Sequence, residues 1–149
     1  MIGLLQRVSQ ARVTIDDSPV AAIGCGLLVL VGVERGDTAT QATRLAERIC
    51  GYRVFPDASG KMNLSVREQG GEVLLVPQFT LAANTEKGMR ASFARAAEPV
   101  AGERLFEALV AAVRALHGSA RTGAFGAQMQ VALVNDGPVT FWLRAAPPA

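Results

Sequence analysis

Two short segments of the chain combine residue types that could bind or convert a small molecule. In the first, Pro77-Gln78-Phe79-Thr80, an amide, an aromatic ring and a hydroxyl come directly after an apolar run. Rigid scaffolds commonly present binding groups at the ends of strands. The segment is therefore a candidate site, with an ordinary strand end as the alternative.

The second segment is the turn Asn135-Asp136-Gly137-Pro138. A peptide bond that precedes proline can be cis, and tight turns are where that geometry is typically found. The alternative is an ordinary hairpin turn, which Asn, Asp and Gly also favour. The residue types alone do not separate these two interpretations.

Side chains for metal or nucleophilic catalysis are scarce. Cys25 and Cys50 form no Cys-x-x-Cys motif, and His117 is the one histidine. This set fits no common zinc spacing and no Ser-His-Asp or Cys-His site, so we expect neither a metal nor a cofactor. His117 stands just before Gly118, where a helix is expected to end, so it is either a helix-terminal residue favoured by the dipole or a chemical group.

Length and composition indicate one globular domain. The chain has 149 residues, of which 50% are hydrophobic and 19% are charged. A chain of this size buries about 70% of its unfolded surface without needing disulfides or a structural metal. No apolar run reaches about 18 residues, and the apolar start lacks a basic leader, so we expect no membrane span, no signal peptide and a cytoplasmic location.

Arginine dominates the basic residues. The net charge is +2, but 13 of the 15 basic side chains are arginine, which binds phosphate through paired hydrogen bonds and stacks on bases. Contact with RNA is one interpretation, and a biased genome composition is another. Because no block of like charge occurs, any nucleic-acid site must be assembled from scattered residues.

The positions of the apolar residues predict one mixed α/β domain with about seven strands and two helices. Strands are expected at residues 2–15, 20–23, 27–33, 52–55, 73–76, 129–134 and 139–144. The helices are expected from a cap at Asp37 or Thr38 to Gly51, and over residues 102–117. A long polar loop is expected at 82–97, and residues 145–149 are expected to fray.

Several motifs follow one another along nearly the whole chain. They are Gln6-Arg7-Val8, Ala11-Arg12-Val13, Lys61-Met62-Asn63-Leu64, Gln78-Phe79-Thr80-Leu81-Ala82, Gly88-Met89-Arg90 with Ser92-Phe93, Met129-Gln130-Val131, and Asn135-Asp136-Gly137-Pro138-Val139-Thr140-Phe141. Together they resemble the D-aminoacyl-tRNA deacylase family, from residue 1 to about residue 144.

This resemblance implies a homodimer of a β-rich layered sandwich, with two sheets and helices on one side. Residues 1–149 would form a single deacylase domain. The implied activity is hydrolysis of the ester that joins a D-amino acid, or glycine, to the terminal adenosine of tRNA, without a cofactor. Aminoacylated tRNA is then the expected partner, with no DNA or membrane partner.

In that family a cis Gly-Pro turn reaches into the pocket of the partner subunit. On this chain the resemblance places the turn at Gly137 and Pro138, with Arg7 bracing it. The carbonyl groups of the turn act as a chiral filter, because they leave no space for an L side chain while a D side chain points to solvent. Glycine has no side chain and also enters.

The resemblance places the catalytic segment at Gln78, Phe79 and Thr80. The family motif begins with serine where this chain has Pro77, so no hydroxyl or N–H contact can come from that position. We expect Gln78, Thr80 and the N–H group of Phe79 or Thr80 to orient the ester and stabilise its oxyanion. The resemblance implies that the 2′-hydroxyl of the terminal ribose assists the nucleophilic step.

Two further sets of residues are expected to touch the tRNA. Phe125 and Met129 would line the adenine pocket, with a plain core role as the alternative. Arg90 and Arg95, in the long loop, are among the arginines expected to contact phosphates.

Two other functions stay open on the sequence alone. One is a non-catalytic module that holds tRNA ends. This function is possible because Pro77 replaces the serine of the catalytic motif. The other is a small-ester hydrolase in which Thr80 is the nucleophile and forms a covalent acyl-enzyme.

Overall fold

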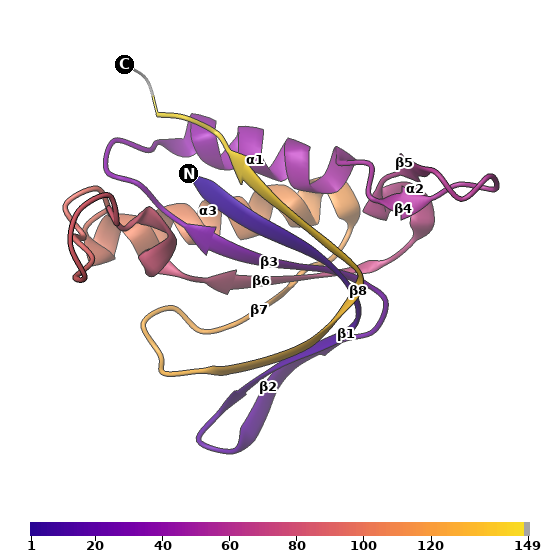
Figure 1. Cartoon of the computed structure of the whole chain (residues 1–149), viewed down its shortest axis with the longest axis horizontal. Helices are drawn as coiled ribbons and strands as arrows, with labels where there is room; N and C mark the ends of the chain where they lie inside the picture. Colours follow the sequence, from indigo (N-terminus) through magenta and orange to yellow (C-terminus); the bar gives the residue numbers. More distant parts are fainter. Residues whose placement is uncertain (148–149) are drawn as a thin grey trace.

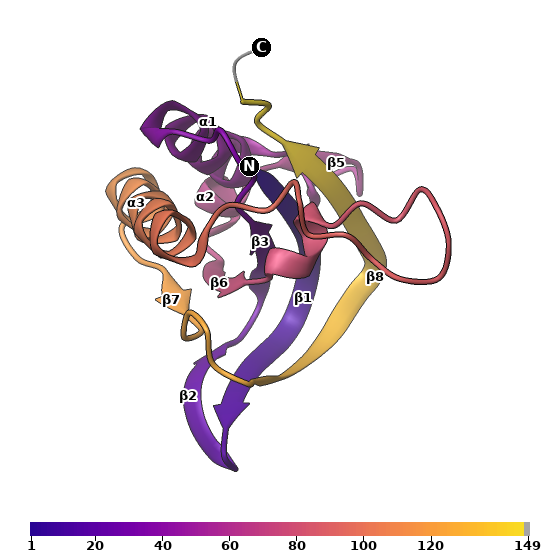
Figure 2. The same cartoon turned by 90° about the vertical axis from the view of Figure 1, so that its left-hand side faces the viewer.

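The computed structural model describes residues 1–147 and places most strands in one bent sheet. This six-stranded sheet has the order β2-β1-β3-β6-β7, with β8 also paired to β1. Its strands are β1 (Ile2–Ile15), β2 (Ser18–Ile23), β3 (Gly26–Gly32), β6 (Glu72–Pro77), β7 (Arg121–Thr122) and β8 (Gln130–Arg144). The helices α1 (Ala39–Gly51) and α3 (Pro99–His117) lie side by side over one face, while β1 and β8 curve away beneath them (Figures 1 and 2).

The expected mixed α/β class is confirmed, but the strands of one chain do not form two comparable layers. Besides the large sheet there is one two-stranded pair, made of β4 (Phe55–Pro56) and β5 (Met62–Leu64). The helices do lie on one side, as expected.

β1 is long enough to pair with three neighbouring strands. Its first half pairs antiparallel with β3, from Ile2 opposite Gly32 to Val8 opposite Gly26, and its second half pairs with β2. β8 runs antiparallel along nearly the whole of β1. β3 also pairs in parallel with β6, and this central position explains its uninterrupted apolar run, because both faces of the strand are covered.

The two long helices begin and end at recognisable capping residues. Thr38 caps α1 through a capping box with Gln41, as expected from its position. α3 begins at Pro99 rather than at residue 102, because proline fits the first helical turn, where its missing N–H loses no hydrogen bond. α3 ends at His117, followed by Gly118 in the left-handed conformation (φ 94°).

Apolar side chains fill both sides of the bent sheet. The larger cluster lies between the helices and the sheet and includes Leu45 of α1, Leu75 of β6 and Leu109 of α3. The smaller cluster includes Val76, and Met129 packs against it. This second cluster therefore holds the residues before β8 close to the end of β6, beside the Pro77 segment.

Several local features differ from the expected elements. Of the strand expected at 52–55 only Phe55 is in a strand, and β5 and β7 were not expected. Ser65 caps the short helix α2 (Val66–Gln69) by a capping box with Glu68, in a stretch too polar and short for periodicity to reveal. A one-turn 3-10 helix, η1 (Phe79–Ala82), follows β6. β8 is a single strand where two were expected, because residues 135–138 form an irregularity within it instead of a hairpin turn.

The two ends of the described chain are tied together through buried charges. The α-amino group of Met1 donates to Glu34 Oε2 at 3.0 Å, to Asp37 Oδ1 at 2.8 Å and to the Ala145 carbonyl at 2.7 Å. Arg144 Nη2 lies 2.9 Å from Glu34 Oε1. Burial opposes ionisation of Glu34, but the hydrogen bonds from Arg144 and from the Met1 amine outweigh it and lower its pKa.

Burial dominates at the neighbouring carboxyl group. Desolvation raises the pKa of Asp37 despite its hydrogen bond from the Met1 amine. The expected fraying of residues 145–149 does not begin at Ala145, because this residue is buried and its N–H donates to the Met1 carbonyl at 2.9 Å. Pro148 and Ala149 lie outside the described residues.

Glu34→Gln is expected to lower the free energy of unfolding by about 1–3 kcal/mol at pH 7, since the buried amine and Arg144 lose a charged acceptor. The pKa of Glu34 is lowered in the folded state, so its contribution is present above the unfolded value of about 4.3 and is lost as the pH falls through the folded value. Urea unfolding should show a smaller difference in the free energy of unfolding between Glu34→Gln and the wild type at about pH 3.5 than at pH 7. An equal difference at both values would contradict this account.

Candidate active site

A groove of about 630 Å³ opens at the end of β6. The start of η1, the start of α3 and the chain before β8 complete its walls. The residues that line it are Val76, Pro77, Gln78, Phe79, Ala97, Pro99, Phe125, Gly126, Ala127, Gln128, Met129 and Val131. Its volume falls in the range of small-molecule sites.

The Pro77 segment forms one wall of this groove. Pro77 ends β6 opposite Val31 of β3, and the Gln78 N–H donates to the Val31 carbonyl at 2.7 Å. Gln78 and Phe79 line the groove, whereas Thr80 lies outside its lining. The Gln78 side-chain amide donates to the Thr80 hydroxyl, so the three residues expected to be catalytic form one connected segment.

The first N–H groups of η1 are free to bind a ligand. The N–H groups at the start of a helix have no acceptor within it. Within residues 1–147, those of Phe79 and Thr80 donate to no other residue, whereas the Leu81 N–H donates to the Gln78 carbonyl. Two backbone donors therefore stand next to the Gln78 amide.

The Thr80 hydroxyl has no base beside it in the described part of the chain. Its hydrogen-bond partner is the Gln78 amide nitrogen, which donates and cannot take a proton. A hydroxyl becomes a nucleophile when a neighbouring base removes its proton. This arrangement does not activate Thr80.

Phe125 and Met129 also line the groove. The Phe125 ring centroid lies 6.4 Å from that of Phe106 on α3, and Met129 packs against the smaller apolar cluster. Both side chains are partly buried. Each of them is thus a groove wall and a part of the packing, the two roles that were alternatives on the sequence alone.

The Gly137-Pro138 peptide bond is cis, and both residues are exposed on β8. Arg7 holds the turn from β1: its Nε donates to the Asp136 carbonyl at 2.9 Å and its Nη1 donates to the Val54 carbonyl at 2.6 Å. Arg7 Nε also lies 3.7 Å from the Asp136 carboxylate. The turn is therefore anchored to the sheet through one guanidinium group.

Asn135 supports the same turn from within β8. Its Oδ1 accepts the Val139 N–H at 3.0 Å, and its Nδ2 donates to the Thr140 hydroxyl at 2.8 Å. Sequence reasoning did not single out these contacts, although asparagine commonly bonds the backbone a few residues away.

The turn and the groove occupy different places along the sheet. Arg7 pairs with Leu27 of β3, whereas Pro77 pairs with Val31, four residues farther along the same strand. At about 3.3 Å per residue, this is an offset of roughly 13 Å. Gly137, Pro138 and Arg7 are absent from the described lining of the groove, so the turn does not complete the groove of its own chain.

His117 and the cysteines lie apart from this groove. His117 Nε2 lies 2.7 Å from the Gly71 carbonyl, and Gly118 ends the helix beside it. This favours the helix-terminal interpretation of His117. Burial raises the pKa of the Cys50 thiol, while Cys25 is exposed elsewhere.

Residues 1–147 contain neither a metal-binding cluster nor a helix suited to crossing a membrane. No cluster of three or more His, Cys, Asp or Glu side chains with metal-binding geometry occurs in that range. Over the same residues, no helix combines the length and apolarity that a membrane crossing requires.

Several lining residues carry no signal in the sequence. Ala97, Pro99 and Gly126 reach the groove only because α3 and the chain before β8 pack against the end of β6. Phe93, from the Ser92-Phe93 motif, is outside the described lining, but its ring centroid lies 5.1 Å from that of Phe79. Neither periodicity nor motif spacing brings these distant segments together.

Comparison with known proteins agrees with the motifs. The model of a family described as D-Tyr-tRNA(Tyr) deacylase matches residues 4–144. A D-aminoacyl-tRNA deacylase of Thioalkalivibrio sulfidiphilus is 62% identical over 148 residues, covering 99% of each chain. One of Alkalilimnicola ehrlichii is 60% identical, covering 100% of this chain and 99% of the relative.

Two solved structures share this fold. The structure of a c-Myc DNA unwinding element binding protein superposes with a TM-score of 0.93 at 36% identity, covering 100% of both chains. The structure of a probable eukaryotic D-amino acid tRNA deacylase has a TM-score of 0.82 at 18% identity, covering 97% of this chain and 98% of that one, and at this identity it shows the fold alone. With the family model matched over residues 4–144 and relatives at 60% identity or more, the chain belongs to the D-Tyr-tRNA(Tyr) deacylase family.

Proposed function

We propose that this protein hydrolyses the ester bond of D-aminoacyl-tRNA, and of glycyl-tRNA mischarged on other tRNAs, as a proofreading step of translation. The products are free amino acid and tRNA. The observation that carries the proposal is that one groove brings together Gln78, Phe79, Phe125 and Met129, in a chain that is 62% identical to a D-aminoacyl-tRNA deacylase.

Each wall of the groove has a separate task in this reaction. Phe125 and Met129 hold the terminal adenine, since aromatic and thioether groups pack on the faces of bases. On the other wall, the Phe79 N–H group and the Gln78 amide face the ester carbonyl, and the Thr80 N–H group follows directly in sequence. Donors already in place stabilise the negative charge that develops on this oxygen without reorganising during the reaction.

The 2′-hydroxyl of the terminal ribose assists the hydrolysis in place of a protein base. Thr80 has an amide donor as its hydrogen-bond partner, which leaves the protein to position the substrate and exclude wrong ones. This mechanism needs no cofactor or metal. Because the 2′-hydroxyl distinguishes RNA from DNA, we propose RNA as the substrate, although one related protein is named for binding a DNA element.

The Gly137-Pro138 turn selects the chirality of the substrate in the groove of a partner subunit. The exposed turn does not line the groove of its own chain, so a second copy is needed to join the two. Its rigid carbonyl groups would clash with an L side chain, while a D side chain points to solvent and glycine fits without contact. Arg7 fixes the turn in the orientation that this selection requires.

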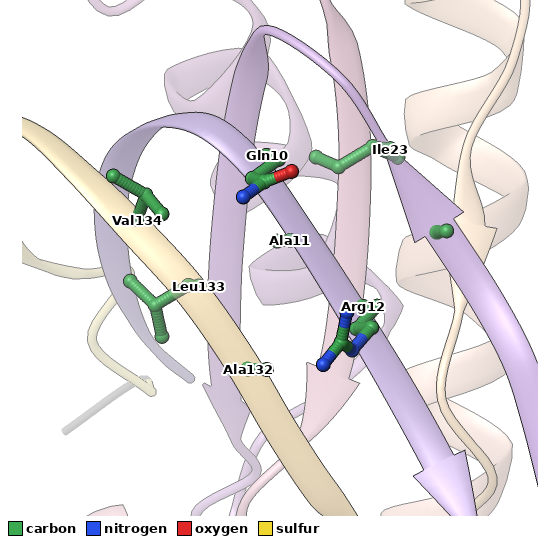
Figure 3. Close-up of a pocket in the computed structure, with 8 residues that line it drawn as sticks. Gln10, Ala11, Arg12, Ile23, Ala132, Leu133 and Val134 are labelled. Atoms are coloured by element: carbon green, nitrogen blue, oxygen red, sulfur yellow. The ribbon is translucent and has the colours of Figure 1, made fainter.

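A second copy also accounts for the open face of the sheet. Leu133 and Val134 of β8 border a hollow of about 260 Å³, with Gln10 and Arg12 of β1 across it (Figure 3). Val134 and Trp142 are 47% and 57% exposed. In a homodimer that covers these residues, the sheets of the two copies would face each other as the layers of a sandwich. Each copy would be a single domain of residues 1–149, and the dimer would act in the cytoplasm.

Replacement of the Thr80 hydroxyl separates this proposal from a hydrolase with Thr80 as the nucleophile. Thr80→Val keeps the shape and removes one hydrogen bond to Gln78, so kcat on D-tyrosyl-tRNA should fall only about 10-fold. Thr80→Ser keeps the hydroxyl and serves as the control. Abolition of turnover by Thr80→Val, or a covalent acyl-enzyme trapped from the wild type by acid quench, would instead identify Thr80 as the nucleophile.

Pro77 favours a second candidate function, a module that binds tRNA ends without cleaving them, because it replaces the serine of the catalytic motif. Binding and turnover of D-tyrosyl-tRNA measured on one preparation separate the two functions. We expect both binding and release of free D-tyrosine. Binding without release would support the module.

A further inference from the structure

Two aromatic rings stand exposed at the edge of the groove. Phe79 is 58% and Phe93 is 45% exposed, and their ring centroids lie 5.1 Å apart with an interplanar angle of 52°. Phe79 also lines the groove, whereas Phe93 lies in the segment between η1 and α3. Large apolar side chains that gather beside a binding groove and remain exposed are typical of a binding surface.

The segment next to Phe93 forms a small hairpin with free positive charge. The Asn84 N–H donates to the Ser92 carbonyl at 2.7 Å, and the Ser92 N–H donates to the Asn84 carbonyl at 3.0 Å. Residues 84–92 project beyond the body of the molecule (Figure 2). Lys87 and Arg90 are exposed on this hairpin, and neither forms an ion pair with a residue among 1–147.

The one acidic residue of the hairpin is already engaged. Glu86 Oε1 lies 3.6 Å from Arg95 Nη2, just beyond the hairpin. Two cations, Lys87 and Arg90, therefore remain to meet an external anion. Met89, between them in sequence, is fully exposed and adds an apolar contact at the tip.

We propose that Phe79, Phe93 and the hairpin 84–92, together called the rim, bind the unpaired nucleotides that precede the terminal adenosine of the tRNA. This inference rests on the proposed function of the groove. Proteins bind single-stranded RNA by stacking bases on exposed aromatic rings and by placing cations along the phosphates. The rim offers both features directly beside the groove that holds the last nucleoside.

Phe79 belongs to both the groove and the rim, so these two sites adjoin. One part of its surface faces the groove, and its ring packs beside Phe93 of the rim. A strand that runs from the groove to the rim passes Phe79. The next base would then meet Phe93, and the phosphates would pass the hairpin that carries Lys87 and Arg90.

Removal of the Phe93 ring tests the stacking. Phe93→Ala is expected to raise the Kd for uncharged tRNA about 5- to 100-fold, with the Kd for adenosine alone unchanged. Phe93→Tyr keeps an aromatic face and should bind tRNA as the wild type does. Both Kd values are measured without catalysis, so the result does not depend on turnover.

Removal of the hairpin charges tests the phosphate contacts. Lys87→Gln with Arg90→Gln should weaken tRNA binding and reduce the slope of log K against log salt by about 0.7 for each phosphate that is no longer neutralised. The matched control is Arg44→Gln with Lys61→Gln, which removes the same charge from α1 and from the turn before β5 (Figure 1). We expect the salt slope of this control to equal that of the wild type.

Different results would refute the rim as an RNA site and the proposed function. Equal loss of tRNA and adenosine binding in Phe93→Ala, or unchanged tRNA binding, would overturn the rim as an RNA subsite. A change of oligomeric state in Phe93→Ala at unchanged tRNA affinity would show that the rings meet a second copy instead. Wild-type protein that binds tRNA through the rim but releases no amino acid would refute the proposed function and leave the rim in place.

Discussion

Gly137→Ala should reduce kcat/KM on D-tyrosyl-tRNA by about 100-fold, the size of effect expected when a reacting group is misplaced by about 1 Å. Gly137 has a φ of 140°, which L residues rarely adopt. An added Cβ would lie 2.7 Å from Val139 Cγ2 and 2.9 Å from the Val139 nitrogen. The turn must therefore shift, and its carbonyl groups leave the positions from which, in the proposed mechanism, they filter the substrate.

The same Cβ would approach the group that anchors the turn. It would lie 3.2 Å from Arg7 Nη2, so the shift would also disturb the bond from Arg7 Nε to the Asp136 carbonyl. Gly60→Ala is the matched control, because Gly60 has a φ of 81° but no atom within 4 Å of an added Cβ. It should introduce backbone strain at a positive φ without a steric clash and without loss of activity. Wild-type turnover and unchanged chirality preference in Gly137→Ala would exclude the turn from the mechanism.

A substrate that lacks the terminal 2′-hydroxyl should be hydrolysed about 100- to 10,000-fold more slowly, the range that proton transfer by a positioned group contributes. The groove offers backbone N–H donors, but within residues 1–147 the hydrogen-bond partner of the Thr80 hydroxyl is the Gln78 amide. The missing assistance cannot come from this side chain. Single-turnover release of D-tyrosine from tRNA ending in 2′-deoxyadenosine, with the ester on the 3′ oxygen, measures the effect.

The control for this experiment is the affinity of the modified tRNA. Because the proposed adenine contacts with Phe125 and Met129 do not involve the 2′-hydroxyl, the Kd of the modified tRNA should stay within a few-fold of that of the unmodified tRNA. This is about 1 kcal/mol or less for the absence of one hydrogen bond. A normal rate with the deoxy substrate would show that the protein itself assists the nucleophilic step. This result would favour Thr80 as the nucleophile.

The local features of the fold could be predicted because neighbouring residues determine them. Thr38 begins α1 and Gly118 ends α3 as expected, since a cap depends on the few residues beside it. The buried run of β3 could be recognised for the same reason. The start of α3 was placed too late, because Pro99 and Val100 precede the apolar stripe on which the periodicity depends.

The assembly of the site could be predicted only in part. Gln78, Phe79, Phe125 and Met129 were each proposed as site residues, and they line one groove. Their shared location depends on α3 and the chain before β8 packing against β6, contacts between segments distant in sequence that no motif spacing encodes. The separation of Gly137 from this groove follows from the register of β1, β3 and β6, which becomes visible only in three dimensions.

Hydrolysis of matched D- and L-tyrosyl-tRNA by the purified protein, in the presence of a chelator, tests the central claim most directly. We expect rapid release of D-tyrosine, an L ester that stays intact, and the same rate with and without the chelator. Release of both amino acids would show that the Gly137-Pro138 turn does not select the chirality of the substrate. Release of neither, with tRNA still bound, would contradict the proposed activity.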